Sequence, residues 1–141
     1  DGEGGDDVIS AGGGHDRLYG SLGADILIGG TGHDRIYGES GGDILIGGTT
    51  DYDTNVVALR LLLDEWSSEN SYADRLANIR SGAGALSGVR LEAGQTVQDD
   101  DVRDRMYGSW GQDWYFADDD DDTMDNDELR RLSNNEIVDS I

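Results

Sequence analysis

Short apolar runs alternate with glycine-rich turns at a fixed period through residues 12–48. Each run follows an aspartate, and these aspartates fall nine residues apart, at Asp16, Asp25, Asp34 and Asp43. One apolar side chain of each run is expected to point inward while its neighbours point outward, as in a short β-strand. The expected inward column is Val8, Leu18, Leu27, Ile36 and Leu45. A disordered glycine-rich linker lacks so regular a column, so the pattern predicts stacked short strands.

Calcium binding is the chemistry that suits these turns. Glycine reaches positive φ without a clash at Cβ, so a glycine-rich hexad can turn sharply and direct several backbone carbonyls at one point. An aspartate carboxylate adds charge, and Ca²⁺ takes about 6–8 oxygen ligands of these kinds. Two nine-residue units make one coil, so turns 18 residues apart stack along one edge. We name the two edges A (Asp6, Asp25, Asp43) and B (Asp16, Asp34).

The repeat Gly-Gly-x-Gly-x-Asp-x-U-x, with U a large apolar residue, is matched at every fixed position by residues 29–37. In this repeat the chain resembles the RTX (haemolysin-type calcium-binding) family. The resemblance implies a mainly β fold, a calcium-stapled parallel β-roll of the solenoid kind, here with an inserted helical excursion. It also implies that each ion lies between two stacked turns and is bound by both aspartates and by turn carbonyls.

The resemblance implies a specific ligand set. The carboxylate ligands are Asp6, Asp16, Asp25, Asp34, Asp43, Asp104 and Asp113. The carbonyl ligands belong to Gly2, Gly4, Gly12, Gly14, Gly20, Leu22, Gly23, Gly29, Gly30, Thr31, Gly32, Gly38, Glu39, Ser40, Gly41, Gly108 and Trp110. This set would bind several Ca²⁺ ions, up to about five, each with the several oxygens that calcium requires.

The first repeat departs from the regular spacing. Asp6 lies ten residues before Asp16, so a one-residue bulge is expected near Ser10. Asp6 is the expected ligand there and Val8 the expected inward residue. Asp1 then takes the first glycine position of a repeat. This indicates that the chain begins inside a repeat, and we expect it to be the carboxy-terminal part of a longer protein.

Residues 49–101 are expected to leave the coil as a helical excursion. A new turn starts at residues 47–50 and is abandoned, and residues 51–54 offer capping groups for a helix. Its apolar side chains at helical spacing are Val56, Leu59, Leu62, Leu63 and Trp66. Residues 67–70 should end this helix.

A second helix is expected to follow within the excursion. Ser71 and Asp74 read as its capping box. Its apolar stripe is Tyr72, Leu76 and Ile79, and it should end near Gly82. The rest, residues 83–98, is expected to be a loop with short strands, whose buried candidates are Val89, Leu91 and Val97.

The repeat returns at residues 102–116, which would place Asp104 on edge B and Asp113 on edge A. We therefore expect one domain that comprises repeats (1–48), a helical insert (49–101), resumed repeats (102–116) and an acidic carboxy-terminal cap (117–141). Val102 to Phe116 would then stack directly on the coil that ends before the insert. The predicted ion sites are the pairs Asp6/Asp25, Asp25/Asp43 and Asp43/Asp113 on edge A, and Asp16/Asp34 and Asp34/Asp104 on edge B.

The outward side chains of the two strand columns differ in polarity. One column contains Ile26, Ile28, Ile44, Ile46, Trp114 and Phe116, which are too apolar to face water as one patch, so the insert helices should cover them. The other contains Arg17, Tyr19, Arg35, Tyr37, Arg105 and Tyr107. This Arg/Tyr ladder is either a solvated face with stacked aromatic rings or a docking surface.

The net charge excludes further classes of function. The 141 residues carry 31 acidic and 10 basic side chains, a formal net charge of -21. Such an excess excludes a binder of nucleic-acid phosphates and disfavours docking to anionic lipid. Bound Ca²⁺ would relieve part of the self-repulsion, so the charge predicts metal dependence. The chain has no Cys, and no apolar run approaches the roughly 20 residues of a membrane span.

Other constellations do not point to catalysis. Residues 118–122 are five consecutive acids that do not fit a calcium loop of the EF-hand type, and they are either a solvated loop or a further weak cation site. Met124 and Leu129 beyond them are core candidates. His15 and His33 share one repeat position and are expected to be structural. No hydrolase motif is present, so we expect no enzymatic activity from this chain.

The sequence therefore favours a calcium-binding module of a secreted or cell-surface bacterial protein. Its partners would be calcium and the upstream part of the same polypeptide. The resemblance implies calcium-triggered folding and export by a type I secretion system, and residues 134–141 resemble the acidic-apolar endings which that system reads. The alternative is a structural or adhesive subunit that self-associates through the roll ends or the Arg/Tyr ladder.

Overall fold

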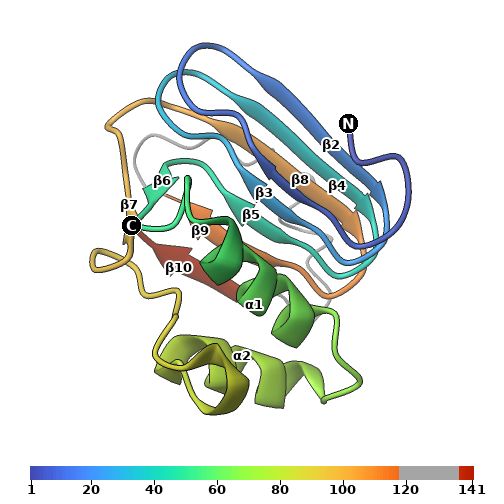
Figure 1. The fold of residues 1–141 in the computed structure, drawn as a ribbon. Coiled ribbons are helices and arrows are strands. Elements are labelled where there is room, and N and C mark those ends of the chain that lie inside the picture. Colours follow the sequence, from blue (N-terminus) through green and yellow to red (C-terminus); the bar gives the residue numbers. More distant parts are fainter. Residues whose placement is uncertain (118–136) are drawn as a thin grey trace.

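The computed structural model describes residues 1–117 and 137–141, and these residues form a mainly β fold with a helical layer on one side (Figure 1). The strands are β1 (Val8–Ser10), β2 (Arg17–Leu22), β3 (Ile26–Ile28), β4 (Arg35–Ser40), β5 (Ile44–Ile46), β6 (Thr49–Thr50), β7 (Val97–Gln98), β8 (Arg105–Trp110), β9 (Trp114–Ala117) and β10 (Ile137–Ser140). The helices are α1 (Val56–Trp66), α2 (Tyr72–Ser81) and the 3₁₀ turn η1 (Gly84–Leu86).

Two parallel sheets face each other, and the chain passes from one to the other at every repeat (Figure 1). The five-stranded sheet has the order β1-β3-β5-β9-β10 and the three-stranded sheet the order β2-β4-β8. Ile26 pairs with Ile44 and Arg17 pairs with Arg35, so neighbouring strands are 18 residues apart in sequence, as two nine-residue units per coil predict. The edge A turns lead into the five-stranded sheet, and the edge B turns lead into the three-stranded sheet.

Coiling resumes after the insert in the same register. Ile44 pairs with Trp114 and Tyr37 pairs with Tyr107, although each pair is 70 residues apart in sequence. Residues 105–117 are therefore part of the same two sheets, as predicted from the returning repeat. Between the sheets lies an inner core of Leu18, Leu27, Ile36, Leu45, Met106, Tyr115 and Ala117.

The first repeat starts one residue later in the structure than was predicted from the sequence. Val8 pairs with Ile26 of the outward column, whereas Ile9 pairs with Leu27 and packs against the inner core. The prediction that Val8 points inward and that a bulge lies near Ser10 is therefore wrong. The repeat begins at Gly2 and not at Asp1, and from there the nine-residue spacing is regular.

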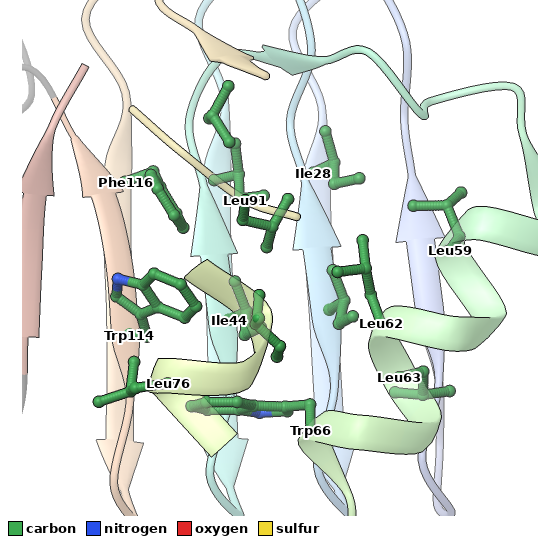
Figure 2. Close-up of a cluster of buried hydrophobic side chains, with 14 of the residues drawn as sticks. Ile28, Ile44, Leu59, Leu62, Leu63, Trp66, Leu76, Leu91, Trp114 and Phe116 are labelled. Carbon is green, nitrogen blue, oxygen red and sulfur yellow. The ribbon is translucent and has the colours of Figure 1, made fainter. Parts of the chain in front are cut away.

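The outward face of the five-stranded sheet is covered by the insert, as predicted. Ile28, Ile44, Trp114 and Phe116 pack against side chains from α1, α2 and the returning loop (Figure 2). The insert contributes Leu59, Leu62, Leu63, Trp66, Leu76, Ile79, Leu86, Leu91 and Val97 to this outer core. The Trp66 indole N–H also donates a hydrogen bond of 2.6 Å to the carbonyl of Gly42 in an edge A turn, so α1 is fixed to the repeats.

Two details of the insert differ from expectation. The amino-terminal cap of α1 is Asn55, whose side chain accepts from the Ala58 N–H, whereas Asp53 accepts from Thr50 and shapes the preceding turn. Val56 is 78% exposed, because the first turn of α1 points it away from the sheet. The capping box at Ser71 and the left-handed Gly82 at the end of α2 are as predicted.

The last strand joins the sheet beside the resumed repeats. β10 pairs in parallel with β9, and Asp139 accepts two hydrogen bonds from Arg80 of α2, at 2.8 and 2.9 Å. Among the described residues no helix is long and apolar enough to cross a membrane. The acidic run 118–122, Met124, Leu129 and residues 134–136 lie outside the described residues.

Candidate metal centre

Aspartates of successive turns are linked in two columns, one along each edge. In each pair the backbone N–H of one aspartate donates to Oδ1 of the aspartate one coil further along. The pairs are Asp7 to Asp25 (2.8 Å), Asp25 to Asp43 (3.0 Å) and Asp43 to Asp113 (2.8 Å) on edge A, and Asp16 to Asp34 (2.7 Å) and Asp34 to Asp104 (2.7 Å) on edge B. The predicted aspartates therefore stack, and both columns continue across the insert.

Asp7, and not Asp6, occupies the aspartate position of the first repeat. The Asp6 side chain lies one residue earlier in the turn and accepts from the Ala24 N–H at 2.8 Å. The predicted pair Asp6/Asp25 is thus corrected to Asp7/Asp25. The signal for Asp7 was present in the sequence, since it lies nine residues before Asp16 and 18 before Asp25.

The glycines of the turns have the backbone conformations that a tight hexad requires. The second and fourth turn positions have positive φ, for example 102° at Gly30 and 114° at Gly32. The fourth-position N–H then donates to the third-position carbonyl of the next coil. These bonds run from Gly5 to Leu22, from Gly14 to Thr31, from Gly23 to Ser40 and from Gly41 to Trp110. A carbonyl oxygen has two lone pairs, so these acceptors can still bind a cation.

The first glycine of each turn makes room for the carboxylate. A Cβ on Gly29 would lie 2.7 Å from Asp34 Oδ2 and 2.6 Å from the carbonyl oxygen of Gly47 in the next coil. Cβ atoms on Gly20, Gly38 and Gly108 would likewise collide with Oδ2 of the aspartate of their own turn. At Gly20 and Gly29, a carboxylate oxygen and a carbonyl of the next coil therefore converge where a side chain is missing.

In the part of the chain that the structure describes, the second carboxylate oxygen has no hydrogen-bond partner at four of these positions. Asp25, Asp34, Asp43 and Asp113 are 0% exposed, and within the described residues their Oδ2 atoms are buried and accept no hydrogen bond. A buried acceptor without a partner costs about 1–3 kcal/mol, and more if it is charged. Ca²⁺ would satisfy these oxygens, because it prefers carboxylate and carbonyl ligands in such turns.

The buried carboxylates also hold protons unusually tightly. Burial raises the pKa of Asp43 to about 8 and that of Asp113 to about 6. Burial likewise raises the pKa of Asp25 and of Asp34, and neighbouring carboxylates add to the effect. At Asp34 these neighbours are Asp16 and Asp100. A divalent cation would reverse this electrostatic penalty, so the donor set fits calcium.

The carboxylates form columns and not compact groups. Within residues 1–117 and 137–141, no three His, Asp or Glu side chains gather in a way that could hold a metal ion by themselves. Backbone carbonyls must therefore complete any cage, as the turn geometry allows. At the first coil Asp7 and Asp16 are half-buried, so the pairs that they form are the most open ones.

The remaining candidate side chains have structural contacts. The His33 N–H donates to Nδ1 of His15 at 3.1 Å, and the two rings meet edge to face. Tyr19, Tyr37 and Tyr107 stack with ring centroids 5.0 Å apart, so the aromatic part of the Arg/Tyr ladder is stacked as predicted.

Sequence reasoning missed two polar side chains at the turns. The Tyr115 hydroxyl, in the inner core, accepts from the Gly108 N–H at 2.9 Å. Asp100 accepts from the Gly32 N–H at 2.6 Å across 68 residues of sequence. Tyr115 occupies the inward position of its repeat, where Leu27 and Leu45 stand in the coils beside it, and Asp100 matches no fixed position. The period therefore predicts neither hydrogen bond.

Comparison with known families agrees with this geometry. A family model described as RTX calcium-binding nonapeptide repeat (4 copies) matches residues 1–27, 19–51 and 96–124. These segments cover more than half of the chain and contain every stacked aspartate named above, while most of the insert lies between them. No curated protein and no solved structure was found to match the chain.

Proposed function

Because the chain belongs to the RTX calcium-binding nonapeptide-repeat family, we propose that it is a calcium-stapled parallel β-roll module whose folding is triggered by Ca²⁺. The repeats of this family bind calcium. The two facing parallel sheets would be the walls of the roll, and the ions would lie in the turns along edges A and B.

One observation carries this proposal. Within the described residues, four aspartates with zero exposed surface have a carboxylate oxygen without a hydrogen-bond partner, and at Gly20 and Gly29 this oxygen lies close to a carbonyl of the next coil. The proposed ions lie between Asp7 and Asp25, Asp25 and Asp43, Asp43 and Asp113, Asp16 and Asp34, and Asp34 and Asp104. This gives up to about five ions, each completed by turn carbonyls to the coordination that calcium requires.

Net charge explains why folding should depend on calcium. With a formal net charge of -21 the chain repels itself, and folding brings its aspartates close together within two columns. Without a cation this arrangement opposes the hydrophobic gain from the inner core. With Ca²⁺ bound to the folded form alone, binding free energy becomes folding free energy.

A calcium titration tests this function. At pH 8, far-UV circular dichroism should show a disordered chain in EDTA and β-structure after Ca²⁺ at about millimolar concentration, the range of extracellular calcium modules. Calorimetry on the same samples gives the number of ions. A native spectrum that persists unchanged in EDTA would refute calcium-triggered folding.

We further propose a secreted or cell-surface setting, in which the module supports the export or display of a larger protein and is not itself an enzyme. A module that folds only in millimolar calcium stays unfolded inside a cell and folds outside it. The absence of Cys is consistent with calcium as the staple in place of disulfides. A micromolar midpoint in the titration would contradict an extracellular role, because that is the range of intracellular calcium sensors.

A further inference from the structure

The edge B turn of the third coil is made from two pieces of chain. Residues 47–48 lead out to the insert and residues 99–104 lead back from it. Gly30 of the coil below donates to the carbonyls of Gly47 and Gly48, each at 3.1 Å, while Asp34 of that coil donates to Asp104. β6 and β7 pair in antiparallel fashion at the junction, with Thr49 opposite Gln98. We name these two pieces together the composite turn.

The composite turn lacks one carbonyl acceptor of a regular coil. In the other turns the fourth-position glycine donates to the third-position carbonyl of the next coil, for example Gly14 to Thr31 at 2.8 Å and Gly41 to Trp110 at 2.8 Å. At Gly32 the acceptor is Oδ2 of Asp100, at 2.6 Å. A side-chain carboxylate has therefore taken the place of a backbone carbonyl.

Replacing a neutral backbone carbonyl with a carboxylate is electrostatically unfavourable at this position. Asp34 lies beside it with zero exposed surface and with an Oδ2 that has no hydrogen-bond partner within the described residues. Asp100 acts electrostatically on Asp34, so the two negative groups are close enough to repel. An asparagine could still accept from the Gly32 N–H through its one amide oxygen without this repulsion, and it would lose the longer bond, 3.2 Å, that the Val102 N–H donates to Asp100 Oδ1. A bound cation would remove the repulsion between Asp100 and Asp34 and would make the extra charge favourable.

Oxygens from both pieces of the composite turn converge on Asp34. The carbonyl oxygen of Gly47 and Asp34 Oδ2 lie within 2.7 Å of one point, the position that a Cβ on Gly29 would occupy. From the returning piece come the half-buried Asp100 and the buried Asp104. Carboxylates and carbonyls together form a hard oxygen donor set of the kind that Ca²⁺ selects.

We propose that the composite turn is a calcium site in which the Asp100 carboxylate replaces the missing turn carbonyl, so that one ion ties together the two ends of the insert. This inference rests on the proposed calcium-binding function. It adds a ligand outside the repeat pattern and a role for it, because an ion held by both pieces closes the insert onto the roll.

Calcium calorimetry on the full chain and its variants tests the proposal. Asp100→Asn keeps an acceptor for the Gly32 N–H but loses the charge and the longer bond from the Val102 N–H, and it should weaken one site by roughly tenfold or more. Asp101→Asn is the matched control, since Asp101 is the adjacent exposed acid and should bind like the wild type. Hydrogen exchange in calcium should show reduced protection of β6 and β7 in Asp100→Asn alone, with β2 and β4 unchanged.

The outcomes separate the possible explanations. If Asp100→Asn binds the same number of ions with the same affinity, while Asp100→Ala unfolds, Asp100 is only a hydrogen-bond acceptor and the proposal is overturned. Equal weakening in Asp100→Asn and Asp101→Asn would reveal a general charge effect and would also overturn it. If the wild type binds no calcium, the proposed function itself fails.

Discussion

Asp6 and Asp7 show how much the surroundings of one residue decide. The two neighbours are chemically identical, but only the backbone of Asp7 lies in register with Asp25, and Asp6 is exposed beside Ala24. One coil further in, Asp25 is fully buried and has an oxygen that no donor reaches within the described residues. At this scale the function depends on which carboxylates the coil desolvates.

Asp34 should be the most sensitive single ligand on edge B, because it belongs to both proposed pairs of that edge. We expect Asp34→Ala to lose at least one calcium ion in calorimetry. His33→Ala is the matched control, since its backbone N–H still reaches His15 but its ring lies outside the carboxylate column. Equal stoichiometry in the two variants would argue against Asp34 as a ligand.

The pKa of Asp43 predicts opposite pH dependences with and without calcium. The pKa is about 8 in the folded, metal-free chain and 3.8 when unperturbed, so the folded state holds more protons between these values. The contribution of Asp43 to metal-free stability is therefore fully present below pH 3.8 and is lost as the pH rises through 8. Calcium must displace this proton, so calcium affinity should increase with pH over the same window.

Two measurements check this pH behaviour. Circular dichroism in EDTA should show more folded chain at pH 5 than at pH 8. Calorimetry in buffers of different ionisation enthalpy should show proton release on calcium binding at pH 5, where more of the metal-free chain is folded and the buried Asp43 holds its proton. Calcium binding that takes up protons, or none, would be inconsistent with the raised pKa of Asp43.

Single elements of this fold are too short to be stable alone. Strands of three residues such as β3 and β5 hold their place because parallel strands pair with them on both sides and a helix covers the outer face. α1 supplies that cover through Leu62, Leu63 and Trp66. Its exposed side has no such role, as Val57 is 72% exposed.

Among the residues of α1, Trp66 should therefore be the one whose replacement destabilises the protein most. It is fully buried, contacts Trp114 and Tyr72, and donates to Gly42. Trp66→Ala should lower the free energy of unfolding in calcium by about 3–5 kcal/mol, measured by urea denaturation. Val57→Ala on the same helix should change it by no more than about 0.5 kcal/mol. Similar values for the two variants would mean that α1 does not seal the sheet.

At the scale of the whole molecule, each coil contacts its neighbours and the insert bridges several of them. Such stacked repeats gain stability from the interfaces between units. The carboxy-terminal strand β10 is joined to this assembly by backbone pairing with β9 and by Asp139, which accepts from Arg80 and from the Trp114 indole. Arg80 also lies over the Trp114 ring, at 5.2 Å from its centroid.

Arg80 should therefore hold the end of the chain in place. We expect Arg80→Ala to increase hydrogen exchange in β10 while the exchange in β2 and β4 stays unchanged. Arg60→Ala is the control, because the Arg60–Asp64 pair is exposed and lies within one helix. If β10 exchanges equally in both variants, backbone pairing with β9 alone is sufficient to hold it.

The amino-acid sequence alone determined the features that recur with the nine-residue repeat. The nine-residue period specified the glycine turns, the inner column from Leu18 to Leu45 and the stacking of Asp16, Asp25, Asp34 and Asp43, because a local turn of fixed length repeats its geometry. The apolar character of Ile26, Ile44 and Trp114 also predicted the cover by α1, since such a surface is unfavourable in water.

The tertiary structure decided what depends on pairing between distant segments. The nine-residue spacing before Asp16 already favoured Asp7 over Asp6, and the strand register shows which of the two faces Asp25, because a shift of one residue moves a side chain to the opposite face of the sheet. The cap at Asn55, the exposure of Val56 and the contact of Asp100 with Gly32 depend on where the insert leaves and rejoins the coil. Those positions are fixed by contacts across as many as 70 residues, and no local period encodes them.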